Sequence, residues 1–303
     1  MSAETDVRLP AVDAFRESIR SSSQAREVWG RLLRNRGAVV GMAFLALLIV
    51  SAILAPLVAP ADPLGVVPAN AQRPPGAEAW LGADHLGRDI LSRLLYGARI
   101  SLTLGLISVS IAAICGTILG LVAGYYGGRV DLAIGVLIDV MLAFPGILLA
   151  LGIVTVLRPG IVNAMVAVGI AAIPTYSRLI RGSVLTAKAN LYVEAARVVG
   201  CQTPRILWLH ILPNVLAPLI VLATLGAAQA ILAGAALSFL GLGAQPPTPE
   251  WGIMLSEGRR YIRDAWWNSM FPGLAIMVTV LAINLLGDGL RDALDPTQRR
   301  VRA

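Results

Sequence analysis

Side chains that could carry out chemistry are few in this chain of 303 residues. Its two histidines are His85 and His210, and no His-Glu-x-x-His pattern places a zinc-binding pair on one helix. A serine protease needs a histidine beside its nucleophile, and a zinc protease needs two histidines together. Apolar spans separate the two histidines here, and we expect them on opposite faces of a membrane. The sequence therefore argues against an intramembrane enzyme.

Hydrolysis of a nucleotide would need a different set of residues. A P-loop binds phosphates through Gly-x4-Gly-Lys-Ser/Thr, and the only lysine of the sequence, Lys188, lies between two alanines. We therefore expect no ATP or Mg²⁺ cofactor in this chain, and an energy source in a partner protein or an ion gradient. The two cysteines, Cys115 in an apolar run and Cys201 in a basic loop, predict free thiols and no disulfide framework.

The composition is that of a membrane protein. Hydrophobic residues make up 56% of the chain and charged residues 14%, and the mean hydropathy is +0.73. The net charge is +7 and the isoelectric point is about 10.1. This basic charge flanks apolar spans and does not interleave with aromatic residues along a polar face, so it predicts no nucleic-acid partner.

Six apolar stretches are long enough to cross a hydrocarbon core about 30 Å thick, which takes about 20 helical residues. Polar residues, proline or glycine separate them. The predicted spans are Gly37–Ala59, Ser101–Tyr125, Val130–Leu157, Ile161–Tyr176, Asn214–Leu240 and Phe271–Gly287. We expect Pro145, Pro174 and Pro218 to kink their helices. The predicted fold class is an all-α membrane protein with six transmembrane helices.

The distribution of positive charge predicts the orientation in the membrane. With six spans both termini share one side, and that side carries 17 of the lysines and arginines against 8 on the other. The positive-inside rule places the termini in the cytoplasm. The predicted parts are a cytoplasmic segment 1–36, a transmembrane domain 37–287 with an external segment 60–100 and a cytoplasmic loop 176–213, and a cytoplasmic tail 288–303.

The segment before the second span has an amphipathic pattern. Its apolar residues recur at helical spacing between Leu86 and Ile100, and its polar residues, including Arg88 and Arg93, lie on the other side. We predict a helix lying in the outer membrane interface. In the second span, glycines four residues apart share one face and would allow a neighbouring helix to approach closely: Gly116, Gly120 and Gly124.

The cytoplasmic loop predicts two short helices joined at a corner. Asn190 is a plausible N-cap for a helix that ends at Gly200, where glycine tolerates the left-handed conformation. Thr203 followed by Pro204 restarts a helix, and Leu212-Pro213 predicts its end. Such a pair could pass a push on its exposed side to both adjoining spans, or it could be an ordinary loop with short helices.

The same loop resembles a known signature. Glu194-Ala195-Ala196, then Gly200 after three residues and Leu212-Pro213 further on, match the EAA signature of permease subunits of bacterial ABC importers. His210 replaces the usual isoleucine, and the ending His210 to Asn214 looks like that of the peptide importer branch.

The resemblance extends from about residue 31 to about residue 300. An external motif runs from Leu81 to Asp89, with Ala83 in place of the usual threonine. The loop after the fifth span and the end of the sixth also resemble this branch, in the segments 238–249, 251–252, 254–258 and 286–296. Together they resemble the second, six-span permease of dipeptide and oligopeptide systems.

This resemblance implies a type I ABC importer permease fold, also called MetI-like. It implies pairing with a homologous second permease as a heterodimer, one or two cytoplasmic ABC ATPases that bind ATP and Mg²⁺, and an external substrate-binding protein. Coupling to the ATPase is carried over to Glu194, Ala195, Ala196, Gly200, Leu212 and Pro213. We add Arg197 and Arg205 from their charge, although both could serve only the positive-inside rule. Short peptides are the expected substrate, with nickel or glutathione as alternatives.

A secondary transporter driven by an ion gradient is the other class to consider. Such proteins carry ionisable groups near the membrane midplane, and Asp139 in the third span is the clearest candidate. We expect Asp139 to pair with a cation such as Arg129 or an arginine of another helix. On the outer side, Trp251, Trp266 and Trp267 could contact a binding protein or anchor the chain at the interface.

Overall fold

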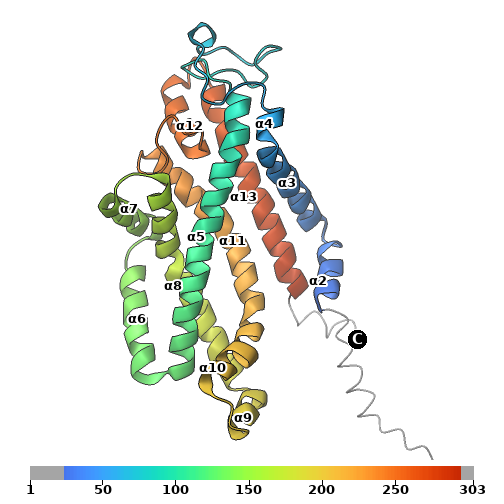
Figure 1. Cartoon of the computed structure of the whole chain (residues 1–303), viewed down its shortest axis with the longest axis vertical. Helices are drawn as coiled ribbons and strands as arrows, with labels where there is room; N and C mark the ends of the chain where they lie inside the picture. Colours follow the sequence, from blue (N-terminus) through green and yellow to red (C-terminus); the bar gives the residue numbers. More distant parts are fainter. Residues whose placement is uncertain (1–23, 295–303) are drawn as a thin grey trace, which may run out of the picture.

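The computed structural model describes residues 24–294, whose regular structure is helical (Figure 1). Parts of the predicted cytoplasmic segment 1–36 and tail 288–303 lie outside the described residues. The helices are α2 (Gln24–Leu32), α3 (Arg36–Ile53), α4 (Ala55–Val58), α5 (Ile90–Tyr126), α6 (Gly128–Leu142), α7 (Gly146–Leu157), α8 (Ile161–Lys188), α9 (Leu191–Val198), α10 (Thr203–Arg205), α11 (Leu212–Phe239), α12 (Trp251–Gly258) and α13 (Trp267–Leu294).

Five helices of the described chain are long and apolar enough to cross a membrane. They are α3, α5, α8, the continuous helix Thr203–Phe239 and α13. The third predicted span is a helix pair, α6 and α7, bent by 91°. The bend falls where the sequence predicted a kink, because Pro145 forms the N-cap of α7 and cannot continue the hydrogen-bond ladder of α6. Counting the bent pair as one span gives the six that the sequence predicts.

The glycines of the second span bring α5 against α8. A Cβ on Gly120 would lie 2.7 Å from the Ser177 carbonyl oxygen, and one on Gly124 would lie 2.9 Å from the Cβ of Val184. Gly116 meets Tyr176 in the same way. Since lipid supplies no hydrophobic drive for helices to associate, close backbone contact is what stabilises this pair. The predicted close approach is confirmed, and α8 is the partner.

Two other close contacts complete the bundle. Gly41 of α3 faces the backbone of α13, where a Cβ would lie 2.5 Å from the carbonyl oxygen of Ala282. Gly105 of α5 faces α11, where a Cβ would lie 2.7 Å from the side chain of Ile231. In Figure 1, α5 and α11 run side by side through the middle of the molecule and α3 lies against α13. Small residues at these contacts fix which helices are neighbours.

The predicted interfacial helix between Leu86 and Ile100 is wrong. Helix α5 starts at Ile90, is capped by the Asp89 carboxylate, which accepts from the Ser92 N–H at 2.7 Å, and runs without a break to Tyr126. Arg93, predicted on a solvated face, is only 1% exposed. The predicted helical periodicity is confirmed from Ile90 onward. The polar face, however, contacts other parts of the protein, and the pattern of one segment cannot predict such contacts.

Several predicted spans extend further than their apolar runs. Helix α8 continues to Lys188, and α13 runs from Trp267 to Leu294. The predicted helix end at Leu212-Pro213 is wrong, because α10, a π-helical segment Ile206–Ile211 and α11 form one helix. The wider π turns directly precede Pro213, whose missing N–H and ring would conflict with the ordinary ladder. A proline inside a helix is thus accommodated by a local change of winding.

Candidate coupling loop, external cluster and membrane cavity

The loop between α8 and α11 has the predicted corner. Helix α9 carries Glu194 and ends before Gly200, which adopts φ +84°. The Gly200 N–H donates to the Arg197 carbonyl at 2.9 Å, and the Cys201 N–H donates to the Ala196 carbonyl at 3.0 Å. These bonds satisfy the end of the helix while the left-handed residue reverses the chain. No other atom lies within 4 Å of a Cβ built at Gly200, so glycine is needed here for its backbone conformation.

The caps of the two short helices differ in detail from the prediction. Asn190 occupies the N-cap position of α9, but its side-chain amide donates to the carbonyls of Thr186 and Ala187, at 2.9 and 3.2 Å. It therefore closes the end of α8 rather than the start of α9. The N-cap of α10 is Gln202, one residue before the predicted Thr203.

The inner face of the loop is packed firmly onto the bundle. Val193, Ile206 and Ile211 are buried in one cluster with the ends of α5 and α8, including Ile180 and Val184. Leu212 and Ala196 pack against this cluster, so they support the loop from within. A movement of α9 would therefore be transmitted to α5 and α8 through side chains in direct contact.

Two cations tie the loop to the end of α5. The Lys188 ammonium donates to the Tyr125 carbonyl at 2.6 Å and lies 5.5 Å from the Tyr125 ring. The Arg197 guanidinium lies 5.3 Å from the same ring. Cation–π contacts at exposed sites contribute about 0.5–1 kcal/mol. Arg197, proposed from its charge alone, thus has a contact within the chain.

The outer face of the loop is exposed and apolar. Leu191, Val198 and Val199 are 81%, 83% and 82% exposed. The remaining predicted coupling residues are also exposed on this loop: Glu194, Ala195, Gly200, Arg205 and Pro213. Apolar side chains this exposed, grouped at the end of a helix bundle, are typical of a surface that a partner covers. The sequence had singled out the polar and small residues of the loop, and missed the valine pair at its tip.

Two aspartates of α6, Asp139 and Asp131, form ion pairs with arginines of α8. Arg178 lies 2.6 Å from the Asp139 carboxylate, as expected for an arginine of another helix. One helical turn further, Arg181 makes two bonds to Asp131. The two pairs fasten α6 to α8, and both are partly exposed. Asp139 is thus explained by an ion pair that joins α6 to α8.

At the end of the molecule that carries α12, which the sequence predicts to be external, a buried ion cluster replaces the predicted interfacial helix. Arg88 donates to the carboxylates of Asp84 at 2.6 Å and Glu257 at 3.0 Å. Arg93 donates to Glu257 at 3.1 Å and lies 3.7 Å from Asp84. Both arginines are 1% exposed. The cluster joins the segment before α5 to α12, two regions far apart in sequence, and sequence reasoning did not find it.

Two of the three tryptophans predicted to contact a partner or anchor the chain at the interface, Trp251 and Trp267, are buried, and the prediction is wrong for them. Trp251 is 1% exposed and its indole N–H donates to the Leu94 carbonyl at 3.1 Å. Trp267 is also buried and donates to the Ala83 carbonyl at 3.1 Å. Both indoles therefore fix external segments from inside, whereas Trp266 remains partly exposed. Burial of an indole requires a partner for its N–H, and the backbone of the external segment provides it.

Glu250 holds the start of α12 at this end of the molecule. Its carboxylate accepts from the N–H groups of Gly252 and Ile253, at 2.9 and 3.0 Å. The side chain is buried beside Ser101, and this burial raises the pKa of the Glu250 carboxyl. The two backbone N–H groups act in the opposite direction and lower the pKa, without reversing the effect of burial.

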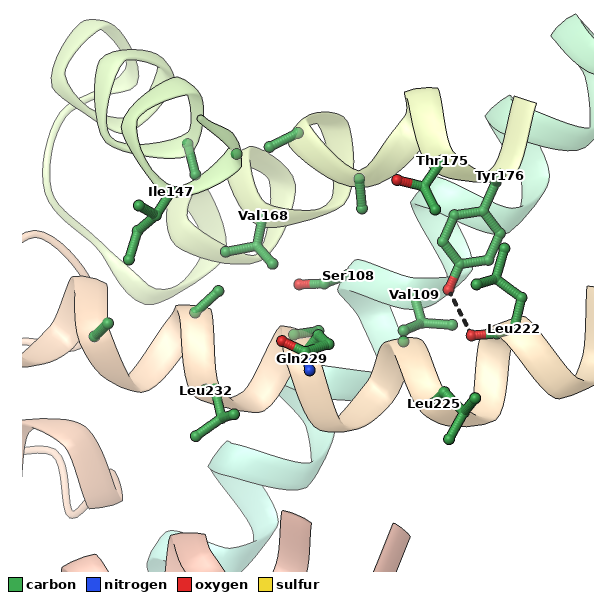
Figure 2. Close-up of a pocket in the computed structure, with 18 of the residues that line it drawn as sticks. Ser108, Val109, Ile147, Val168, Thr175, Tyr176, Leu222, Leu225, Gln229 and Leu232 are labelled. Carbon is green, nitrogen blue, oxygen red and sulfur yellow. Dashed lines mark hydrogen bonds between the residues drawn. The ribbon is translucent and has the colours of Figure 1, made fainter. Parts of the chain in front are cut away.

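A cavity of about 760 Å³ lies among α5, α7, α8, α11 and α13 (Figure 2). Most of its lining is apolar. Its polar side chains are Ser108, Thr175, Tyr176, Gln229 and Asn284. Two of them are bonded within the protein: Ser108 donates to the Met165 carbonyl at 2.9 Å and Tyr176 donates to the Leu222 carbonyl at 3.4 Å. A cavity between membrane helices is where transport proteins bind what they carry.

A bundle of membrane helices with a cavity among them and a packed loop at one end is an architecture that suits a membrane transport protein. The family model described as "Binding-protein-dependent transport system inner membrane component" matches residues 116–300. A second, "N-terminal TM domain of oligopeptide transport permease C", matches residues 23–75. The chain therefore belongs to the family of binding-protein-dependent transport system inner membrane components, and it is a multi-pass protein of the inner membrane.

Relatives match along almost the whole chain. The dipeptide transport system permease protein DppC of Alkalihalophilus pseudofirmus is 48% identical over 274 residues, 90% of each chain. The glutathione transport system permease protein GsiD of Pectobacterium atrosepticum is also 48% identical, over 89% of this chain and 90% of its own. A solved chain of the MetNI methionine ABC transporter in an inward-facing conformation is similar in structure, with a TM-score of 0.53 and 19% sequence identity. The match covers 68% of this chain and 98% of that one. This likeness establishes the MetI-like fold that the sequence predicts.

Proposed function

We propose that this chain is the permease subunit of an ABC importer that moves short peptides into the cell. The observation that carries the proposal is α9, whose inner face packs on α5 and α8 while Val198 and Val199 stand exposed at its tip. A cytoplasmic ATPase that covered this tip could move α9 and with it the membrane helices. The absence of a P-loop from the sequence agrees with energy supplied from a partner.

The same proposal fixes the orientation. The loop with α9 and the termini face the cytoplasm, since these parts carry most of the lysines and arginines. The segment before α5 and α12 then face outward, at the opposite end of the molecule from α9 (Figure 1). The external end would receive peptide from a binding protein, and a homologous second permease would complete the pathway as a heterodimer.

Peptide is preferred as the substrate over the alternatives. Several relatives are named as dipeptide or di/tripeptide permeases, and glutathione, carried by another named relative, is itself a tripeptide-like molecule. A nickel importer of the same family remains the alternative that the sequence raised. Short peptides are thus the substrate class that we would test first.

The direct test is isolation of the tagged chain from mildly solubilised membranes, followed by reconstitution with whatever accompanies it. We expect a second permease and one or two ATPases, and ATP-dependent uptake of a labelled dipeptide into proteoliposomes when the binding protein is added. A stable assembly of this chain alone that transports without ATP would contradict the proposal and favour a gradient-driven transporter.

The coupling surface has its own test. Val199→Asp places a charge on the exposed tip without disturbing a packed side chain, so we expect normal insertion but loss of the ATPase from the purified assembly. The matched control is Val66→Asp in the segment before α5, outside every membrane span, where the side chain is 54% exposed. Retention of the ATPase by Val199→Asp would show that α9 is not the docking element.

A further inference from the structure

The membrane cavity contains polar groups that the chain itself leaves without partners. Gln229 lies on α11, Asn284 on α13 and Thr175 on α8, and all three line the cavity. The side chains of Gln229, Asn284 and Thr175 form no hydrogen bond with any other of the described residues. Ser108 and Tyr176, in contrast, are bonded to backbone carbonyls. Figure 2 shows Gln229 on α11 and Thr175 on α8 within the same lining.

Lipid is a poor occupant for such a cavity. An amide placed against hydrocarbon loses its hydrogen bonds to water, which costs several kcal/mol. Polar side chains within membrane spans therefore face water or polar groups far more often than lipid. Gln229 lies within the membrane-spanning helix Thr203–Phe239, and its side chain is exposed toward the cavity and bonded to no other of the described residues. Something that forms hydrogen bonds must fill this space during the working cycle.

The chemistry of the lining narrows what that occupant is. None of the lining side chains is an aspartate, glutamate, lysine, arginine or histidine, so the cavity offers no fixed charge to hold an ion. Gln229 and Asn284 each present one acceptor oxygen and two donor hydrogens, and Thr175 presents a hydroxyl. A peptide group has one donor and one acceptor, which these amides can match. Hydrogen bonds between neutral groups are weak, so a cargo held by them can also dissociate readily.

We propose that Gln229, with Thr175 and Asn284, forms a cargo-contact site for the peptide groups of the transported molecule. The proposal rests on the proposed function, because it names the residues of this chain that the peptide meets within the membrane. The apolar remainder of the lining, such as Ile147 and Leu232, leaves room for side chains of varied size without selecting one. The site therefore recognises the backbone of a peptide rather than its sequence.

The first experiment measures uptake of a labelled dipeptide by the whole assembly in proteoliposomes. Gln229→Leu keeps the size of the side chain but removes its hydrogen bonds, and we expect the maximal uptake rate to fall about tenfold. The control is Thr224→Val on the same helix, whose hydroxyl donates to the Ile220 carbonyl and lies outside the cavity lining. Thr224→Val should transport normally. Unchanged uptake by Gln229→Leu would overturn the proposal.

The second experiment asks what occupies the cavity. In a chain with both native cysteines replaced by alanine, Gln229→Cys is treated with a water-soluble thiol reagent, with and without dipeptide and binding protein. We expect labelling that saturating dipeptide slows several-fold. Leu281→Cys, at an exposed position of α13 outside the cavity lining, is the control and should be unaffected by peptide.

The other outcomes separate this proposal from the proposed function. Labelling only by a membrane-permeant reagent would mean that lipid covers the cavity, and labelling that peptide does not slow would mean that water or the second permease does. Either result, with normal uptake by the unaltered assembly, overturns the cargo-contact site alone. Failure of the unaltered assembly to take up any peptide would overturn the proposed function as well.

Discussion

The two ends of this molecule are built on opposite principles. At the end that we propose to be external, Arg88 and Arg93 are buried between Asp84 and Glu257, and two indoles donate to backbone carbonyls. At the other end, α9 is packed on one side only, and its valine pair is exposed. The external end is thus closed by interactions within the chain, whereas the loop end is left incomplete. An incomplete surface is where we expect a partner to bind.

The difference separates structural support from coupling. A buried ion pair is weak evidence of net stability, but breaking it by removing one partner is strongly destabilising because a charge is left unpaired. The exposed side chains of the loop form few contacts within the chain, so substituting them should change the free energy of unfolding little. Such substitutions should alter partner binding and transport instead. The following predictions test that division, beginning with the largest expected effect.

Removal of one buried arginine should have the largest effect on stability. Arg88→Ala removes the hydrogen bond of 2.6 Å to the Asp84 carboxylate. It also removes one of the two arginines that bind Glu257. We expect the free energy of unfolding to fall by about 3–5 kcal/mol, measured by thermal denaturation in detergent. Arg73→Ala is the matched control, because Arg73 bonds only to Asn70 and to the exposed Glu78 close to the surface and should change little. Equal effects would mean that the cluster is not the support we infer.

The corner of the loop should respond differently. Gly200→Val forces a β-branched residue into φ +84°, which we expect to cost about 1–3 kcal/mol locally. Because the strain falls on the loop, membrane insertion should remain normal while ATP-dependent transport is lost. Gly127→Val is the control, since Gly127 also has positive φ and open space around its Cβ but lies in the α5–α6 turn. Normal transport by inserted Gly200→Val would refute the lever.

The cap of α12 should have an intermediate effect. Glu250→Ala leaves the N–H groups of Gly252 and Ile253 unpaired, and we expect a loss of about 1–2 kcal/mol in the free energy of unfolding.

This cap also predicts a dependence on pH. Burial raises the folded-state pKa of the Glu250 carboxyl above its unfolded value. The stabilising contribution of the protonated Glu250 to the free energy of unfolding is therefore fully present below the unfolded pKa. That contribution is lost as the pH rises through the raised pKa. Glu250→Gln carries no ionisable group, and its stability should lack this fall with rising pH in parallel denaturation curves. Curves of the same shape for both proteins would count against the assigned shift.

The smallest expected change concerns the contact between Arg197 and Tyr125. Arg197→Gln removes a guanidinium 5.3 Å from the Tyr125 ring, and we expect a loss of about 0.5–1 kcal/mol in stability. Transport measured in the reconstituted assembly should fall only if Arg197 also contacts the ATPase. Arg205→Gln, at an exposed arginine of the same loop, is the comparison variant. A large loss of stability in Arg197→Gln would place this residue in the support of the loop rather than on its docking surface.

Sequence by itself determined the features that follow from local chemistry. The lengths of the apolar runs fixed the number of spans, because each must satisfy its backbone within a helix. Pro145 marked the broken span, the three glycines of α5 marked a close contact, and Gly200 marked the corner of the loop. Each of these positions is set by what one residue type can do with its own backbone, so neighbours in sequence suffice to predict it.

Only the tertiary structure decided which distant groups meet. The polar face before α5 looked solvated because its carboxylate partner Glu257 lies more than 160 residues away in sequence. Trp251 was taken for a surface residue for the same reason, since its acceptor belongs to α5. The unpartnered amides of Gln229 and Asn284 become informative only when the helices that carry them line one cavity. Ion pairs, buried indoles and cavities depend on the packing of whole helices, and no local pattern contains that information.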